Sequence, residues 1–572
     1  MRRVARPPRT PRPAEALARL EAARATFGSD AERTKLASLA TLDRSRLARA
    51  DQVLRLHDAL CFLRAYPDGP RLLDRVERML RAFERRQDLA RHRAALQDSG
   101  VAGTPIEYRF FWPTARWLAR RWGGRLSIVW KDFEQQDRLL DLLPALTLYG
   151  ETPALDEIDY PTREWLRRLK GAESDGAFLV RRFAALAIDD VAREKIYDQL
   201  DPPLRIAPGP GTPSRTLARH PVRAIAWQRR PLAHERPDLT LALRQPPRSV
   251  RAVTPAEGQQ LIDLARVSMV TRSRDLDAFS WGDPRDVRLA DCSDGLQFAV
   301  IGVVPERRLM MEAVYAFLTL KNGVPIGYVL NSALYRSAEI AYNVFETWRG
   351  AEAGVVYARA LATVRHLFGA DSFTIYPYQL GEENDEAIAS GAWWFYQKLG
   401  FRPRDPGVRR RMNAELSIMR RRPAHRSSAA TLRRLAHANL YYHMGRERDD
   451  VIGILPLPAI GLAVQRLVAE RFGSDRERAE EVLTREAARM LGIRSARSVS
   501  AGERLAWRRW SPVVHLLGDL ARWSAAERRA LVDIVRAKGG RRESEFALRF
   551  DRHRRLRAAI RTLAWAEDRA NP

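Results

Sequence analysis

Apolar residues recur at three- and four-residue spacing through most of residues 14 to about 200, which is the pattern of amphipathic helices. The segments "ADQVLRLHDALCFLRAY" (50–66) and "GPRLLDRVERMLRAFERR" (69–86) follow this pattern closely. One short run, "RLSIVW" (125–130), instead has the composition of a strand. The pattern therefore predicts an all-α N-terminal region over residues 1–200.

The pattern then breaks at "LDPPLRIAPGPGTP" (200–213), where prolines and glycines follow one another closely. Such a stretch supports neither a helix nor a central strand, so it indicates a linker or extended segment over residues 201–247. Helical periodicity returns after residue 427, as in "SAAERRALVDIVRAKGG" (524–540). We expect a second all-α region over residues 428–572.

Between the two helical regions, strands alternate with helices. "SVRAV" (249–253) reads as a strand, and "TPAEGQQLIDLARVSMV" (254–270) reads as a helix whose Thr254 and Glu257 have the spacing of a capping box. "AVYAFLTLKNGVPIGYVL" (313–330) reads as two strands joined at Asn-Gly, a strong hairpin signal. Residues 248–423 are therefore predicted to form a mixed domain with its own sheet.

Composition limits the protein classes that remain. A chain of 572 residues with 45% hydrophobic residues is long enough for about three domains with sizeable cores. No apolar stretch is long enough to span a bilayer, and the arginine- and proline-rich start lacks the apolar segment of a secretory signal. Cys61 and Cys292 form neither a disulfide framework nor a CxxC pair. We expect a cytoplasmic protein without a metal site.

The net charge of +28 raises the question of nucleic-acid binding. Only seven of the 98 basic residues are lysine, and the arginines are mixed with acidic residues along helices, as in "RVERMLRAFERRQDLARHRAAL" (75–96). That mixture is typical of solvated helix faces. Binding to nucleic acid therefore stays an alternative and is not the favoured interpretation.

The chemically informative segment is "NVFETWRGAEAGVVYARALATVRHLFG" (343–369), where a strand turns directly into a helix. The first turn of a helix offers unpaired N–H groups and the positive end of the helix dipole. Small residues between Gly350 and Gly354 would let a phosphate approach the backbone, and Arg349 adds a cation beside it. Small residues also let a helix pack closely on a sheet, so the pattern alone leaves both interpretations open.

This segment resembles motif A of the GNAT acetyltransferase superfamily. Val344, Trp348, Arg349 and Gly354 match the motif's strand valine, aromatic residue, cation and last glycine, whereas Glu352 stands where the family prefers a first glycine. A second match is "YQKLGF" (396–401), which resembles the end of the family's next helix. The resemblance extends in order over residues 248–423.

The resemblance implies an α/β (α+β) GNAT-like central domain with a mixed, mostly antiparallel sheet, flanked by all-α regions. It also implies that acetyl-CoA or another acyl-CoA is a co-substrate. The residues that would bind it are Val344, Arg349, Gly350, Ala351, Glu352, Ala353 and Gly354. Because the Glu352 carboxylate would repel a pyrophosphate, it lowers the expected affinity unless it points outward or pairs with an arginine.

For catalysis, the resemblance assigns Tyr396 to protonate the departing thiolate. The best-placed candidate for a general base is Glu346, which strand alternation would put on the same face as Val344 and Trp348. The family often uses an ordered water instead of a fixed base. Its asparagine before the last helix is replaced here by Ala389, and Ser390 or Asn384 are the alternatives.

The sequence thus predicts a CoA-dependent N-acyltransferase that transfers an acyl group, which the resemblance implies is acetyl, to an amine of unknown identity. The alternative is a GNAT-like fold that has lost catalysis and acts as a binding or structural module, which Glu352 and Ala389 favour. A nucleic-acid-binding protein rich in arginine is a third interpretation. His57 and Cys61, four residues apart on an apolar helix, read as core residues.

Overall fold

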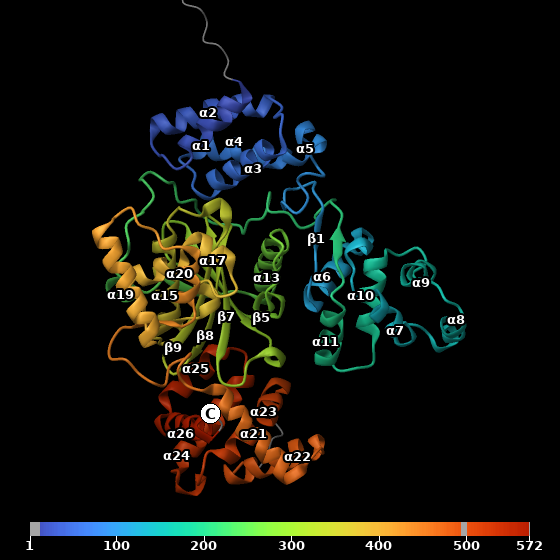
Figure 1. The fold of residues 1–572 in the computed structure, drawn as a ribbon, viewed down its shortest axis with the longest axis vertical. Coiled ribbons are helices and arrows are strands. Elements are labelled where there is room, and N and C mark those ends of the chain that lie inside the picture. Colours follow the sequence, from blue (N-terminus) through green and yellow to red (C-terminus); the bar gives the residue numbers. More distant parts are fainter. Residues whose placement is uncertain (1–11, 494–499, 571–572) are drawn as a thin grey trace, which may run out of the picture. The chain divides into compact units, whose positions relative to one another are not determined.

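The computed structural model describes residues 12–493 and 500–570, which form two compact units (Figure 1). The first unit takes in the residues up to Leu232, together with Gln260–Trp281 and Lys321–Ile326. The second takes in Ala233–Gln259, Gly282–Leu320 and the chain from Gly327 onward. Each unit is described by itself below.

The first unit is mainly helical but also contains a three-stranded sheet of order β1-β3-β2. Its helices are α1 (Pro13–Ala23), α2 (Ser29–Arg44), α3 (Ala50–Ala65), α4 (Pro70–Ala82), α5 (Gln87–Arg91), α6 (Trp112–Trp122), α7 (Gln136–Leu146), α8 (Thr152–Glu157), α9 (Thr162–Leu169), α10 (Asp175–Ala185), α11 (Asp190–Leu200) and α14 (Asp277–Ser280). The strands are β1 (Ile106–Tyr108), β2 (Leu126–Ile128) and β3 (Leu204–Ile206).

The small sheet corrects two expectations. The all-α prediction for residues 1–200 is wrong at β1 and β2, although β2 confirms the strand expected within residues 125–130. The linker prediction is wrong at β3, which is the central strand and pairs antiparallel with both neighbours. Leu204 and Ile206 are buried and Arg205 between them is exposed, so alternating burial stabilises a strand despite the flanking prolines.

The second unit is built on a nine-stranded sheet of order β11-β12-β10-β9-β8-β7-β6-β5-β4. The strands are β4 (Ser249–Ala252), β5 (Gly282–Asp291), β6 (Leu296–Val303), β7 (Ala313–Lys321), β8 (Val324–Leu334), β9 (Ser337–Val344), β10 (Ser372–Ile375), β11 (Arg402–Pro403) and β12 (Leu440–His443). Strands β9 and β10 pair parallel, whereas β8 with β9 and β10 with β12 pair antiparallel. A mixed α/β fold with a large mixed sheet is thus confirmed.

Helices cover this sheet and follow it in the chain. They are α12 (Leu239–Ala242), α15 (Ala353–Phe368), α16 (Pro377–Leu380), α17 (Asp385–Ser390), α18 (Ala392–Lys398), α19 (Pro406–Arg421), α20 (Ala429–Ala436), α21 (Leu457–Phe472), α22 (Arg476–Met490), α23 (Ala501–Leu516), α24 (Ala525–Gly539), α25 (Glu543–Arg552) and α26 (Arg554–Ala570). Helix α13 (Pro255–Val270) begins in this unit, and its residues from Gln260 onward belong to the first unit.

The local signals in the strand-rich region are confirmed. Thr254 Oγ1 accepts a hydrogen bond from the Glu257 N–H at 3.2 Å, as the capping spacing predicts. Asn322 and Gly323 take φ values of 50° and 78° between β7 and β8, which suits a two-residue hairpin turn. Helix α15 ends at Gly369, whose φ of 69° is a left-handed cap.

The C-terminal helices share one hydrophobic core with the sheet. Trp510 in α23 and Phe550 in α25 belong to the same buried cluster as Phe317 of β7 and Val364 of α15. Strand β12 also comes from this part of the chain, so the prediction of an all-α region after residue 427 is wrong at Leu440–His443. This strand is only four residues long and pairs with two strands distant in sequence, which a local pattern does not reveal.

In residues 12–493 and 500–570 we find no helix that combines the length and the apolar character needed to cross a membrane.

Candidate functional site

The residues predicted to bind acyl-CoA lie where β9 runs into α15. Strand β9 ends at Val344, and Glu346–Trp348 forms a 3₁₀ turn. Phe345 and Trp348 are both buried, with ring centroids 6.4 Å apart. Residues three apart face opposite sides of a strand but the same side of a 3₁₀ turn, so burying both rings favours the turn.

This turn corrects the position of Glu346. The prediction that alternation along a strand aligns Glu346 with Val344 and Trp348 is wrong, because the strand has already ended. The Glu346 side chain is exposed on the turn. Its role as a general base stays a prediction, now without the placement that suggested it.

The proposed phosphate-binding turn is open at its beginning. Gly350 has a φ of 80°, and a Cβ placed on it would meet no atom within 4 Å. The Ala351 N–H is already engaged, since it donates to the Trp348 carbonyl at 3.1 Å. Glu352 is the N-cap residue of α15, and Ala353 is the first residue of the helix. The turn therefore leads into a helix terminus, as the sequence predicts. It offers a phosphate one free backbone N–H fewer than expected, because that of Ala351 is engaged.

Close packing against Pro237 explains why residue 354 is a glycine. A Cβ on Gly354 would lie 3.2 Å from Cδ of Pro237, a tight contact between the first turn of α15 and the proline-rich segment before α12. The sequence left phosphate binding and close packing open as reasons for the small residues. The structure supports packing at Gly354 and leaves Gly350 accessible.

Arg349 is half exposed and forms an ion pair with Glu386 of α17. Its Nε also donates to the Val344 carbonyl at 3.4 Å. Because an exposed ion pair contributes little to stability, a phosphate could replace Glu386 at low free-energy cost. Arg349 is thus near the turn, as predicted, and is held by a carboxylate that a ligand would have to displace.

Tyr396 lies in the core of the second unit. Its side chain, on α18, is 3% exposed and makes ring contacts with Tyr357, Phe395 and Phe401. Burial, with a smaller effect of the neighbouring Tyr328, raises the pKa of the Tyr396 phenol above its ordinary value. Its proposed role as an acid stays a prediction, and it requires that the acyl donor reach a side chain that is closed off here.

The alternatives to the missing asparagine have local structural roles. The Asn384 side chain caps α17 by accepting from the Ala387 N–H at 3.1 Å. The Ser390 hydroxyl donates to the Ala387 carbonyl at 3.1 Å. Both groups therefore stabilise the short helix that precedes Tyr396.

A carboxyl group that sequence reasoning missed lies on β9. Glu339 pairs with Thr374 of β10, and this is the last residue pair of the parallel register, although β9 continues to Val344. Burial, together with the charge of Glu312, raises the pKa of Glu339 from 4.5 to about 7. A carboxyl group that titrates near neutrality is the type of group that transfers protons in enzymes.

Two residues that interact electrostatically with Glu339 line a cavity of about 840 Å³, which we call the acidic cavity; Glu339 itself is not part of the lining. Glu312 and Tyr376 line this cavity, and both interact electrostatically with Glu339. Burial raises the pKa of Tyr376, and the two carboxylates raise it further. The remaining lining is largely apolar and includes Met310, Met311, Leu455, Ile460, Val464 and Val513, with Arg509 and Asn439 as polar members.

A buried ion pair lies next to Glu312 and does not cancel the effect of burial on its carboxyl group. Lys538 donates to the Glu312 carbonyl oxygen at 2.7 Å and pairs with Glu543 at 2.5 Å. Both members of the pair are at most 5% exposed. Since the charge of Lys538 is matched by Glu543, burial still raises the pKa of Glu312.

The described residues contain no cluster of three or more His, Cys, Asp or Glu side chains that could hold a metal ion. His57 and Cys61 of the first unit are both buried, as expected for core residues. His57 Nε2 is hydrogen-bonded with the Thr216 hydroxyl at 2.8 Å, so the buried imidazole has a polar partner within the core.

Comparisons with protein-family models, with curated proteins and with solved structures found no match to this chain.

Proposed function

We propose that the second unit is a CoA-dependent N-acyltransferase, acting on an amine that enters the acidic cavity. The observation that carries the proposal is the position of Glu339. A carboxyl group with a pKa of about 7 stands where the pairing of the parallel strands stops, on the strand that leads into the Arg349–Gly354 turn, and it interacts electrostatically with Glu312 and Tyr376 of the cavity lining.

The order of elements supports the proposal. The GNAT resemblance expects a strand, a helix and a second strand in succession, and β9, α15 and β10 occur in that order with the two strands parallel. Tyr342 of β9 packs on Tyr357 of α15, with ring centroids 5.0 Å apart. Side chains alternate along a strand, so Glu339 projects from the face opposite Tyr342. The helix terminus and the carboxyl group would thus act from different faces of the sheet.

In the proposed reaction, Glu339 takes a proton from the amine as its nitrogen attacks the thioester carbonyl carbon. A carbon–nitrogen bond forms, the carbon–sulfur bond breaks, and the leaving thiolate receives a proton. Tyr396 is the proposed donor of that proton. The carboxyl groups of Glu312 and Glu339 favour a cationic or basic acceptor, and the apolar lining favours one with a hydrocarbon portion.

The turn before α15 fits the phosphates of acyl-CoA in part. Gly350 is open, the helix dipole is favourable, and Arg349 is close enough to contribute once Glu386 is displaced. The engaged Ala351 N–H and the contact of Gly354 with Pro237 reduce the donors available. We therefore propose modest affinity for the donor. A cytoplasmic location is part of the proposal, since acyl-CoA donors are intracellular metabolites.

The central test measures release of free CoA thiol from acetyl-CoA and longer acyl-CoAs in the presence of a panel of primary amines. We expect Glu339→Gln to lower the rate about a hundredfold or more, because general base catalysis is lost. Glu346→Gln tests the other carboxylate in parallel, and a larger loss there would transfer the role of base to Glu346. The control is Glu545→Gln, an exposed carboxylate of α25.

A second measurement examines the donor and the tyrosine. Calorimetry with acetyl-CoA should show binding that weakens in Arg349→Gln. Tyr396→Phe should lower turnover more than affinity, and unchanged turnover would remove Tyr396 from the mechanism. If millimolar acyl-CoA gives neither heat nor a thermal shift, the enzyme proposal fails.

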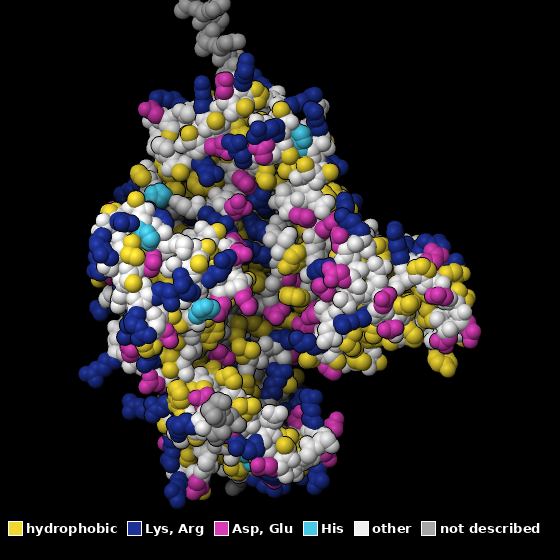
Figure 2. Space-filling model, viewed as in Figure 1, with side chains coloured by type: hydrophobic (Ala, Val, Ile, Leu, Met, Phe, Trp, Pro, Cys, Tyr) yellow, Lys and Arg dark blue, Asp and Glu magenta, His cyan; other side chains and the backbone are white. Residues whose placement is uncertain are grey.

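The alternative is a GNAT-like binding or structural module without catalysis. The Arg349–Glu386 ion pair and the Pro237 contact favour this alternative, because both occupy groups that a donor would need. It predicts an acidic cavity that still binds amines while no thiol is released. Nucleic-acid binding is less well supported, since basic and acidic side chains are interspersed on the face seen in Figure 2.

A further inference from the structure

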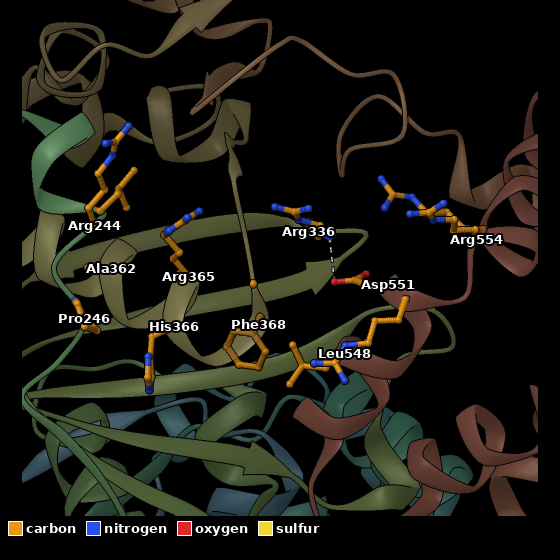
Figure 3. Close-up of a pocket in the computed structure, with 14 residues that line it drawn as sticks. Arg244, Pro246, Arg336, Ala362, Arg365, His366, Phe368, Leu548, Asp551 and Arg554 are labelled. Atoms are coloured by element: carbon orange, nitrogen blue, oxygen red, sulfur yellow. Dashed lines mark hydrogen bonds between the residues drawn. The ribbon is translucent and has the colours of Figure 1, made fainter. Parts of the chain in front are cut away.

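A second cavity of about 840 Å³ in the same unit has the opposite charge. Six arginines line it, and we call it the arginine cavity; they are Arg244, Arg336, Arg365, Arg552, Arg554 and Arg557. These side chains come from the segment after α12, the turn before β9, the last turn of α15, and helices α25 and α26. In Figure 3 the side chains of Arg244, Arg365, Arg336 and Arg554 follow one another across the view, with Phe368 and Leu548 beneath them.

Part of this cluster has structural partners. Arg336 pairs with Asp371 at 3.0 Å, and Arg557 pairs with Asp450 at 2.5 Å. Arg365 donates to the Ala370 carbonyl at 3.2 Å. These contacts hold Arg336, Arg365 and Arg557 in place on one side of the cavity.

The other arginines have no such partners. Within the described residues, Arg244, Arg552 and Arg554 make no ion pair and no side-chain hydrogen bond, and all three are exposed. Like charges brought together in a concave site repel one another unless a counter-charge is present. Three unpaired guanidinium groups around one cavity therefore indicate an anionic ligand, for which arginine provides planar, bidentate donors.

The single carboxylate of the lining, Asp551, offsets the charge of only one of the six arginines. Its Oδ2 accepts from the Arg336 N–H at 3.1 Å, and its Oδ1 is buried away from the cavity's solvent. Two helix ends also meet the cavity. The positive end of α26 begins at Arg554, and the negative end of α15 lies at Gly369, so their dipoles oppose each other and the arginines determine the sign.

Leu243, Phe368, Leu548 and Pro246 are apolar members of the lining. Leu243 and Phe368 are at most 2% exposed, so the accessible apolar floor is formed by the half-buried Leu548, with the exposed Pro246 at its side. A volume of this size is in the range of small-molecule sites, and an apolar floor gives a flat ring a surface to lie on. We propose that the arginine cavity binds a nucleoside di- or triphosphate, with its phosphates on Arg244, Arg552 and Arg554 and its base against Leu548.

This site is separate from the proposed acyl-CoA site, which uses the first turn of α15. The arginine cavity uses Ala362, Arg365, His366 and Phe368, at the other end of the same helix. The proposal therefore does not depend on the acyltransferase proposal, and each can fail alone.

The test is calorimetry of the full chain with ATP, ADP, inorganic tripolyphosphate, adenosine and a short single-stranded oligonucleotide. We expect ATP to bind at least about tenfold more tightly than tripolyphosphate because of the apolar floor, and adenosine to bind weakly for lack of phosphates. Arg552→Gln and Arg554→Gln should each weaken ATP binding about tenfold, and the double variant about a hundredfold. Since both side chains are exposed, the variants should fold normally.

Arg529→Gln is the charge-matched control, because Arg529 is an exposed arginine of α24 outside the cavity lining. It should leave ATP affinity unchanged, and an equal loss there would overturn the proposal by showing a general charge effect. Equal affinities for ATP and tripolyphosphate would overturn the part played by the apolar floor. Binding of the oligonucleotide without ATP, or no binding of ATP at millimolar concentration, would overturn the proposal altogether.

Discussion

The acidic cavity and the arginine cavity have similar volumes and belong to the same unit, yet they hold their charges in different ways. Glu312 and Glu339 are half-buried under apolar side chains, and burial raises the pKa of both carboxyl groups. Arg244, Arg552 and Arg554 stand exposed at the edge of their cavity. Burial therefore shifts the pKa of the carboxyl groups at one cavity, whereas the three arginines of the other cavity are in contact with solvent.

This difference has a general consequence for stability. A buried ionisable group is coupled to the folding free energy through desolvation and through its partners. An exposed charge without a partner is coupled weakly. The two cavities should therefore respond very differently to the removal of one charge, and three measurements in order of expected size examine this.

The largest effect is expected at the buried pair next to Glu312 of the acidic cavity. Lys538→Met would leave Glu543, which is fully buried, without its partner at 2.5 Å. Breaking such a pair from one side destabilises a protein by about 3–5 kcal/mol. Urea denaturation at neutral pH measures the change. The double variant Lys538→Met with Glu543→Leu should recover part of the loss, and a single-variant loss below about 1 kcal/mol would contradict the interpretation.

A smaller effect, with the opposite sign, is expected for Glu339→Gln. The pKa of Glu339 is raised from 4.5 to about 7, so the folded state disfavours ionisation of this group. Its contribution to stability is fully present below about pH 4.5 and is lost as the pH rises to about 7. Above pH 7 the variant should be more stable than the wild type, by at most about 3 kcal/mol.

Urea midpoints measured between pH 4 and pH 8 examine this prediction. The stability difference between Glu339→Gln and the wild type should grow through that window and then level off. A difference that does not change with pH would show that Glu339 ionises as freely as in the unfolded chain.

The smallest effect is expected in the arginine cavity. Arg554→Gln removes an exposed charge that has no partner in the described residues, so the stability should change by less than about 0.5 kcal/mol. The same denaturation experiment measures it, with Arg529→Gln for comparison. A loss as large as that of Lys538→Met would show that Arg554 is structural, and would remove the contrast between the two cavities.

Much of the fold of the second unit follows from local sequence signals. The Thr254 cap of this unit and the Asn322-Gly323 turn, which belongs to the first unit, are each determined by a few adjacent residues, and both were predicted. The strands β1, β3 and β12 were missed because each is short and is stabilised by partners distant in sequence. Glu346 was misplaced because two buried rings favour a turn over a continued strand.

The candidate site was predictable only where its residues are adjacent in the sequence. Arg349 and Gly350 lie at a helix start that the sequence shows directly. Glu339 was missed because its altered pKa comes first from burial in the folded chain and then from the charge of Glu312, a residue of another segment. A single glutamate within the apolar stretch "SAEIAY" (337–342) was the available signal. The arginine cavity gathers side chains from segments more than 300 residues apart along the chain, and no local pattern joins them.

Helix α15 connects the turn at Gly350 with the arginine cavity. It has 16 residues, so its ends are about 24 Å apart along a single rigid rod. If both proposed ligands bind, any effect of the nucleotide on acyl-CoA affinity must be matched by an equal factor in the other direction, because linkage between two sites on one molecule is reciprocal. One helix would in this way make the proposed acyl-CoA site respond to the nucleotide concentration.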